Sequence, residues 1–210
     1  RFVVSEMAGR STLELKANDL GIDLDGKVLG DVVEVLKRLE YEGYHFEVAD
    51  ASLELLMRGA SGWKQDFFEV ESFSVDMNHI GSGSRAWNEI SVEVDTRAVV
   101  DLFVDGKKVV GLGDGNGPVN AIDSALRSVL TDSYPELKAI SLVDYKVRVL
   151  DTEKGTGAVT RVLLDSTNGE ANWTTIGVSE NIIEASWQAL IDSLVYGLLH
   201  SPHQDLPQNR

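Results

Sequence analysis

The stretch GLGDGNGPVNAIDSALRSVL (residues 111–130) joins a glycine-rich segment directly to an amphipathic pattern. Pro118 stands where a first helical residue is expected, since its φ is already set and it has no N–H to leave unpaired. Ile122, Leu126 and Leu130 then recur at helical spacing. The stretch therefore predicts a glycine turn that leads into a helix with one buried face.

The same design returns in GVSENIIEASWQALIDSLVYGLL (residues 177–199). Each predicted helix follows three strand-like runs, which indicates a duplicated βββα unit. Two units are too few for a solenoid, so we expect them to pack on each other or on a second chain. A single alignment offset pairs four residues of the two stretches: Gly113 with Gly177, Ala121 with Ala185, Ala125 with Ala189, and Leu126 with Leu190.

The segment before the repeats has a helical pattern. After a strand-like opening over residues 1–11, apolar residues recur at helical spacing over residues 25–41, and Gly43 suits a helix C-terminus. Asp50 is placed to cap a second helix. The predicted fold class is α+β, with a small helical subdomain over residues 1–60 and a second domain over residues 61–210, in which repeat one covers about 66–134 and repeat two about 136–201.

Alternating apolar and polar residues predict the strands of both repeats. In repeat one, strand patterns occur at residues 67–77 and 90–94 and on both sides of Asp105-Gly106, a hairpin signal because both residues tolerate positive φ. In repeat two the strand patterns cover residues 140–150, 157–165 and 173–178, with a turn at Asn168-Gly169.

Composition limits the classes of partner. Of the 210 residues, 43% are hydrophobic, which is enough for an ordinary core, and the formal net charge is −15. This balance argues against nucleic-acid and anionic-membrane partners, because phosphate is bound by clustered Lys and Arg. Cysteine is absent, which excludes disulfides and thiolate chemistry. No uninterrupted apolar run approaches the roughly 18 residues of a membrane span, and we expect a cytoplasmic location.

The glycine cluster of residues 111–117 does not fit a phosphate loop. It lacks the Lys and Ser/Thr of a Walker sequence, and Asp114 repels phosphate. Two interpretations stay open. The glycines can serve a tight turn with positive φ, or the helix start that follows can hold one carboxylate through its free N–H groups.

No catalytic constellation is visible in the sequence. The four histidines form no metal-binding pattern, and no nucleophile elbow is present. In residues 144–148, Tyr145 and Val147 share one face of a predicted strand, while Asp144, Lys146 and Arg148 share the other. That charged face is either a solvated surface or a pocket wall.

Several segments resemble the C-terminal regulatory region of the α-isopropylmalate synthase and citramalate synthase family. They are GDGNGPVNAIDSAL (113–126), LVDYKVRVL (142–150) and TTIGVSENIIEASWQALIDSLVYGLL (174–199). VVSEMAGRS (3–11) and LEYEGYHFEVADASLELLMR (39–58) resemble the linker subdomains of that family. The resemblance covers nearly the whole chain, and NIIEASWQALIDS (181–193) favours the citramalate synthase branch.

The resemblance implies a regulatory and dimerisation domain of an enzyme that condenses acetyl-CoA with a 2-oxo acid. In that family an N-terminal barrel holds a divalent metal with an HxH motif, which this sequence lacks. We therefore expect a post-barrel fragment without catalytic residues, metal or cofactor of its own. The family implies a homodimer that binds an end-product amino acid at the dimer interface. Isoleucine is favoured; a leucine-sensing domain of 2-isopropylmalate synthase and a purely structural dimerisation domain are the alternatives.

The resemblance also implies an effector site, made of two helix starts and an apolar wall. Residues 88–96 depart from the family pattern, which leaves the path of residues 79–97 open. The implied site residues are Asn116, Gly117, Pro118 and Val119 at the first helix, Leu142, Tyr145, Val149, Thr156 and Thr160 in the wall, and Val178, Ser179 and Glu180 before the second helix.

Overall fold

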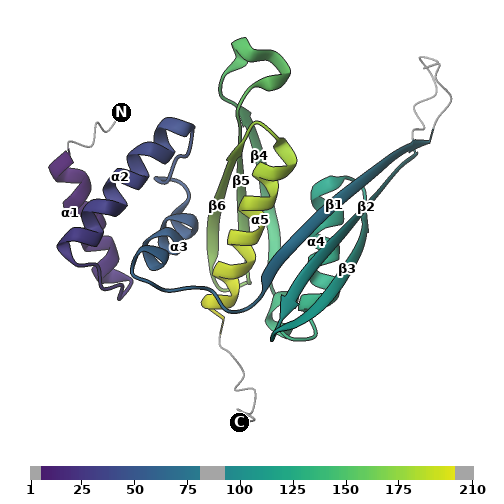
Figure 1. The fold of residues 1–210 in the computed structure, drawn as a ribbon, viewed down its shortest axis with the longest axis horizontal. Coiled ribbons are helices and arrows are strands. Elements are labelled where there is room, and N and C mark those ends of the chain that lie inside the picture. Colours follow the sequence, from purple (N-terminus) through teal and green to yellow (C-terminus); the bar gives the residue numbers. More distant parts are fainter. Residues whose placement is uncertain (1–5, 81–92, 202–210) are drawn as a thin grey trace, which may run out of the picture. The chain divides into compact units, whose positions relative to one another are not determined.

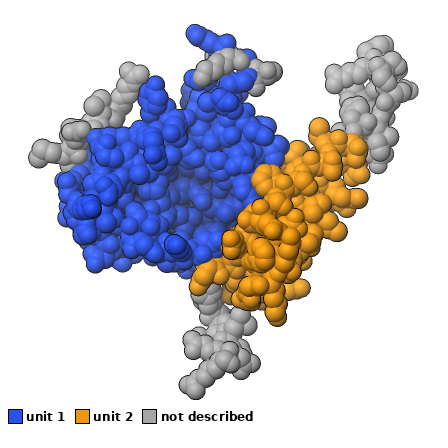
Figure 2. All heavy atoms as spheres, viewed as in Figure 1, with its two compact units in different colours: residues 1–65, 140–200 blue, residues 66–139, 201–210 orange. Residues whose placement is uncertain are grey.

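The structure is a computed structural model that describes residues 6–80 and 93–201. The chain forms two compact units, coloured separately in Figure 2. Unit 1 comprises residues 1–65 and 140–200, and unit 2 comprises residues 66–139 and 201–210. Each unit contains one three-stranded antiparallel sheet followed by a helix (Figure 1), so the predicted α+β class and the duplicated βββα design are confirmed.

Unit 2 contains the first repeat. Its sheet has the order β1-β2-β3, made of β1 (Glu69–Ile80), β2 (Glu93–Val104) and β3 (Lys107–Gly115). Asp105 and Gly106 both have positive φ in the tight turn between β2 and β3, as the Asp-Gly pair predicted. Helix α4 (Pro118–Leu130) starts at the predicted proline and is followed by η1 (Pro135–Lys138).

The glycine cluster is not a turn, and that prediction was wrong. Gly111, Gly113 and Gly115 lie in β3, and none of them has positive φ. A Cβ atom at Gly113 would lie 2.2 Å from the backbone nitrogen of Ala125 and 2.4 Å from the carbonyl oxygen of Ala121. Glycine is required because α4 lies on this strand at backbone contact, and only a residue without Cβ leaves room.

Unit 1 combines the N-terminal helices with the second repeat. The helices are α1 (Glu6–Asp19), α2 (Gly26–Glu42) and α3 (Asp50–Ala60). The second sheet has the order β4-β5-β6. Its elements are β4 (Ser141–Val149), η2 (Thr152–Gly157), β5 (Thr160–Thr167), β6 (Asn172–Ser179) and α5 (Ile182–Leu199).

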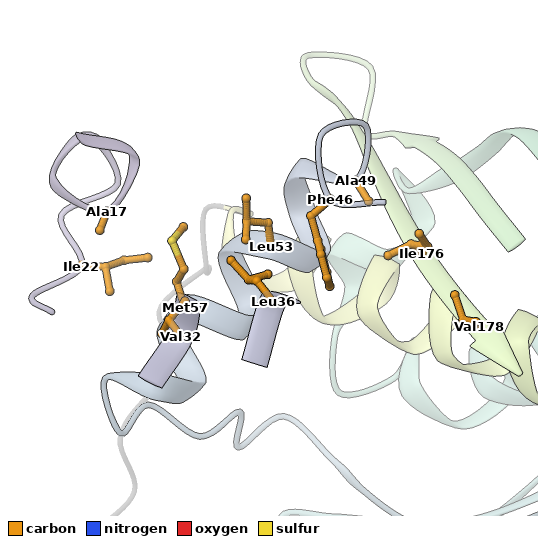
Figure 3. Close-up of a cluster of buried hydrophobic side chains, with 10 residues drawn as sticks. All are labelled: Ala17, Ile22, Val32, Leu36, Phe46, Ala49, Leu53, Met57, Ile176 and Val178. Carbon is orange, nitrogen blue, oxygen red and sulfur yellow. The ribbon is translucent and has the colours of Figure 1, made fainter. Parts of the chain in front are cut away.

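The helices of unit 1 share a core with its sheet. Phe46 and Leu53 from the helical segment join Ile176 and Val178 of β6 in one buried cluster (Figure 3). On its other face β6 contacts α5, where Thr175 donates a hydrogen bond to the carbonyl of Ala189. Strand β6 is therefore buried on both faces. The division into domains of residues 1–60 and 61–210 stays a prediction. In the structure, compact unit 1 joins residues 1–65 with residues 140–200.

Two local predictions in the helical segment were wrong. Residues 6–11 of the strand-like opening belong to α1. Asp50 is the first residue of α3 and makes no capping bond; its carboxylate accepts a hydrogen bond from the backbone N–H of Thr174 at 3.2 Å. By contrast, Gly43 ends α2 with a φ of 116°, as predicted.

Helix α5 is apolar because it is a core helix. Length and composition alone would allow it to cross a membrane, but half of it is buried against protein. Leu190, Leu194 and Leu198 of this helix are buried, whereas Ile183, Trp187 and Ile191 are only partly buried. Small residues such as Ala185, Ala189 and Gly197 form much of the surface that packs on the sheet, as their close contacts show.

Candidate functional site

An uncovered apolar stripe runs along β4, the edge strand of the second sheet. Leu142, Tyr145, Val147 and Val149 pair with the residues of β5 that are buried under α5, so they lie on the α5 side of the sheet. The exposed fractions of Leu142, Val147 and Val149 are 48%, 41% and 46%. Strand alternation places Tyr145, Val147 and Val149 on one face. The register shift between Leu142 and Asp144 brings Leu142 to the same face. The edge position of β4 leaves this face uncovered within unit 1.

Tyr145 connects this stripe to α5. Its hydroxyl lies 2.8 Å from the Oγ atom of Ser186. Because the Ser186 hydroxyl donates to the carbonyl of Ile182 at 2.6 Å, the Tyr145 hydroxyl is the donor in the first bond. The ring is thereby held against the first turn of α5, with apolar side chains beside it.

Ser186 was not among the predicted site residues. Comparison of the two repeats could have identified Ser186 from the sequence. The offset that aligns Ala121 with Ala185 aligns Ile122 with Ser186. Both residues are buried, and a hydroxyl replaces an apolar side chain only in the second repeat. A buried hydroxyl needs a hydrogen-bond partner, and here Tyr145 and Ile182 supply it.

The predicted residues of unit 1 divide between the two faces of the sheet. Thr160 and Ser179 pair with each other and lie on the face of Tyr145. Val178 lies on the opposite face, 9% exposed, in the core with the N-terminal helices. Glu180 is exposed directly before α5, and Thr156 belongs to η2. The sheet therefore brings Leu142, Tyr145, Val149, Thr160 and Ser179 to one face and leaves Val178 out.

The predicted residues Asn116, Gly117, Pro118 and Val119 belong to unit 2, at the junction of β3 and α4. Gly117 precedes the helix in an extended conformation and makes no side-chain cap. The N–H of Asn116 donates to Oδ1 of Asn120 at 3.2 Å. The first N–H groups of a helix have no intrahelical acceptor, so this start keeps free donors of the kind that bind a carboxylate.

The charged face of β4 includes an ion network. Lys146 Nζ lies 2.8 Å from Oδ2 of Asp144 and 2.8 Å from Oδ2 of Asp165. The hydrogen bond from Lys146 lowers the pKa of Asp144, and the hydrogen bonds to both carboxylates raise the pKa of Lys146. Within residues 6–80 and 93–201, no three His, Asp, Glu or Cys residues come together as metal ligands.

Comparison with known families covers most of the chain. A family model described as the LeuA allosteric (dimerisation) domain matches residues 47–198. The chain belongs to this family. The LeuA-type region thus begins before α3 and ends in α5, and it includes both βββα modules.

The LeuA-type chain is also similar to curated enzymes. It is 48% identical over 204 residues to the (R)-citramalate synthase of Streptomyces coelicolor and 42% identical over 208 residues to that of Aquifex aeolicus. These alignments cover 96% and 98% of this chain. They cover 36% and 38% of the two relatives, so the chain spans little more than a third of their length.

Proposed function

We propose that this chain is the regulatory and dimerisation region of a citramalate synthase, an acyl-CoA-condensing transferase that joins acetyl-CoA and pyruvate on the route to isoleucine. The similarity to (R)-citramalate synthases over nearly the whole chain supports the assignment. The catalytic barrel and its divalent metal would lie in a part of the enzyme outside these residues, and the location would be cytoplasmic. The region itself contributes no catalytic residue.

The observation that carries the binding proposal is the uncovered apolar stripe on β4, with Tyr145 fixed at its centre. A branched side chain would lie against Leu142, Tyr145 and Val149, because removing such apolar surface from water stabilises a complex. At the start of α5 the N–H of Ile183 already donates to the side chain of Asn181, and the N–H of Asn181 donates to Ser179. The remaining N–H groups of this helix start would hold a carboxylate, and Glu180 would take an ammonium group. The contribution of residues 116–119 stays a prediction of the resemblance.

The same stripe supports a homodimer. An exposed edge strand with apolar side chains on one face favours association with a second copy. Binding of the amino acid next to such an interface would change the relative stability of dimer states, and a coupling of about 1–3 kcal/mol would suffice for feedback inhibition. Isoleucine is the expected effector.

Calorimetric titration of the chain with isoleucine, leucine and valine tests this proposal. We expect isoleucine to bind more tightly than leucine or valine. Tyr145→Ala should weaken binding by about tenfold or more. The matched control is Tyr41→Ala, which changes a tyrosine that is 94% exposed in α2. No heat with any of the three amino acids contradicts the effector proposal.

The two alternatives predict different results. A domain of 2-isopropylmalate synthase that senses leucine would bind leucine most tightly. A purely structural dimerisation domain would bind none of the three amino acids, and Tyr145→Ala would change only its stability or association. Sedimentation velocity of wild type and Tyr145→Ala over a range of concentrations separates this last case from a failure to fold.

A further inference from the structure

A cavity lies at the β4 edge of the second sheet, lined mainly by residues of the face opposite Tyr145 and also by Val147. It has a volume of about 390 Å³ and lies between the segment that follows α2 and strands β4, β5 and β6. Its lining includes three cationic side chains and one carboxylate. This local excess of positive charge is unusual in a chain with a formal net charge of −15. The side chains that matter here are Lys146, Arg148, Arg161, Asp165, His45 and Val48.

The two arginines of this cavity face each other. Arg148 of β4 and Arg161 of β5 are direct partners in the antiparallel ladder, so their side chains leave the sheet on the same face. Like charges at directly opposed positions destabilise a sheet. Consistent with this, burial and the charge of Arg148 lower the pKa of Arg161. The fold therefore contains a repulsion that a bound anion would remove.

The other charged groups of the cavity do not neutralise this pair. Asp165 receives an ion pair from Lys146 and a hydrogen bond from the Thr174 hydroxyl at 2.6 Å. Arg161 donates its Nε–H to the carbonyl of Gly43, a neutral acceptor, which fixes the guanidinium against the end of α2. Within the described part of the chain, Arg148 has neither a hydrogen-bond acceptor nor an acidic partner.

We infer that this cavity is a binding site for a small anion that carries a phosphate or carboxylate group, with Arg148 as the primary ligand and Arg161 as the second. A guanidinium binds such groups through two parallel N–H···O bonds. Val48, which is 43% exposed, and Leu163 offer apolar contacts for the body of the ligand. The two arginines are separate from the proposed amino-acid site, because the sheet lies between Arg148 and Tyr145, while Val147 borders both sites.

The test uses pyrophosphate, inorganic phosphate and succinate as probes in calorimetric titrations at low and high salt. We expect at least one probe to bind, with an affinity that falls as salt rises. Arg148→Gln should weaken binding by about tenfold or more. The matched control is Arg38→Gln, which removes one exposed positive charge from α2 and should leave the affinity unchanged. The relative affinities of phosphates and succinate identify the group that the site prefers.

Arg148 is exposed and makes no bond that the fold needs, and its removal relieves the repulsion with Arg161. Arg148→Gln should therefore stay folded and unfold at a urea concentration no lower than that of wild type. It should also keep its response to isoleucine, which distinguishes failure of this site from failure of the effector site. The inference is overturned if no probe binds wild type, or if Arg148→Gln and Arg38→Gln weaken binding equally. It is also overturned if Arg148→Gln alters only dimer dissociation, because the arginines would then serve a protein interface.

Discussion

A Cβ atom added to Gly177 would lie 1.9 Å from the carbonyl oxygen of Ala185. Strand β6 and helix α5 thus meet at backbone contact, as β3 and α4 do at Gly113 and Ala121. The aligned glycines of the two repeats perform the same packing role.

Gly177→Ala is expected to lower the free energy of unfolding by about 1–3 kcal/mol, because the added methyl group forces β6 and α5 apart. Urea unfolding followed by circular dichroism measures the change. Gly30→Ala is the matched control, since a Cβ at Gly30 meets no atom within 4 Å and this residue lies inside α2. That variant should gain about 0.5–1 kcal/mol from helix propensity. Similar destabilisation in both variants would contradict the packing explanation.

Stability should fall with rising pH because of Asp192. Burial raises the pKa of this carboxyl group to about 6, although the Ser52 hydroxyl, which donates to it at 2.6 Å, acts in the other direction. The unfolded chain has a pKa near 4, so the folded state binds the proton more tightly. The resulting stabilisation is complete below about pH 4 and is lost as the pH rises through about 6.

We expect the free energy of unfolding to fall by on the order of 1 kcal/mol over this pH range. This is a small value for the pKa shift of Asp192, because this residue is partly exposed and solvent weakens the effect. Urea unfolding at about pH 4.5 and pH 7 measures it. Asp192→Asn should abolish this part of the pH dependence, whereas Asp132→Asn, at an exposed position, should retain it. An unchanged pH profile in Asp192→Asn would refute the assignment.

Glu54 is a buried charge that connects α3 to the end of α5. Its side chain is 2% exposed and accepts hydrogen bonds from Arg58 at 2.7 Å and His200 at 2.9 Å. Glu54→Ala should cost about 2–3 kcal/mol of stability, since two partly buried donors lose their acceptor. Glu34→Ala breaks an exposed pair with Lys37 and should change stability by less than about 0.5 kcal/mol. Thermal melts of both variants measure these changes. Equal losses of stability in Glu54→Ala and Glu34→Ala would contradict the idea that burial makes the Glu54 interactions stronger.

The hydrogen bond between Tyr145 and Ser186 can be tested with a double-mutant cycle. Tyr145→Phe and Ser186→Ala should each lower the free energy of unfolding by about 0.5–1.5 kcal/mol, and the double variant should lose less than the sum. Chemical denaturation of the four proteins gives the coupling energy. If the changes in the two single variants add up to the change in the double variant, the hydrogen bond between Tyr145 and Ser186 does not contribute to stability.

Local sequence predicted much of each repeat. Asp105-Gly106 predicted its hairpin because few residues adopt positive φ, and the helix start at Pro118 followed from a fixed φ. The alternation around Tyr145 placed Arg148 on the other face of β4, since side chains alternate along any strand. The glycines of β3 were misinterpreted because a turn and a close helix contact both require a missing Cβ, and the sequence does not distinguish them.

The sequence by itself determined the order of strands and helices in each repeat and the shared face of Tyr145 and Val147, because these depend on neighbouring residues along one chain. Only the tertiary structure decided that the N-terminal helices bury Ile176 and Val178. The register of β4, β5 and β6 sets Val178 on the face opposite Tyr145. The tertiary structure also placed Arg148 of β4 directly opposite Arg161 of the neighbouring strand β5. Strand register and helix docking arise from contacts between residues far apart in sequence, and local patterns do not specify these contacts.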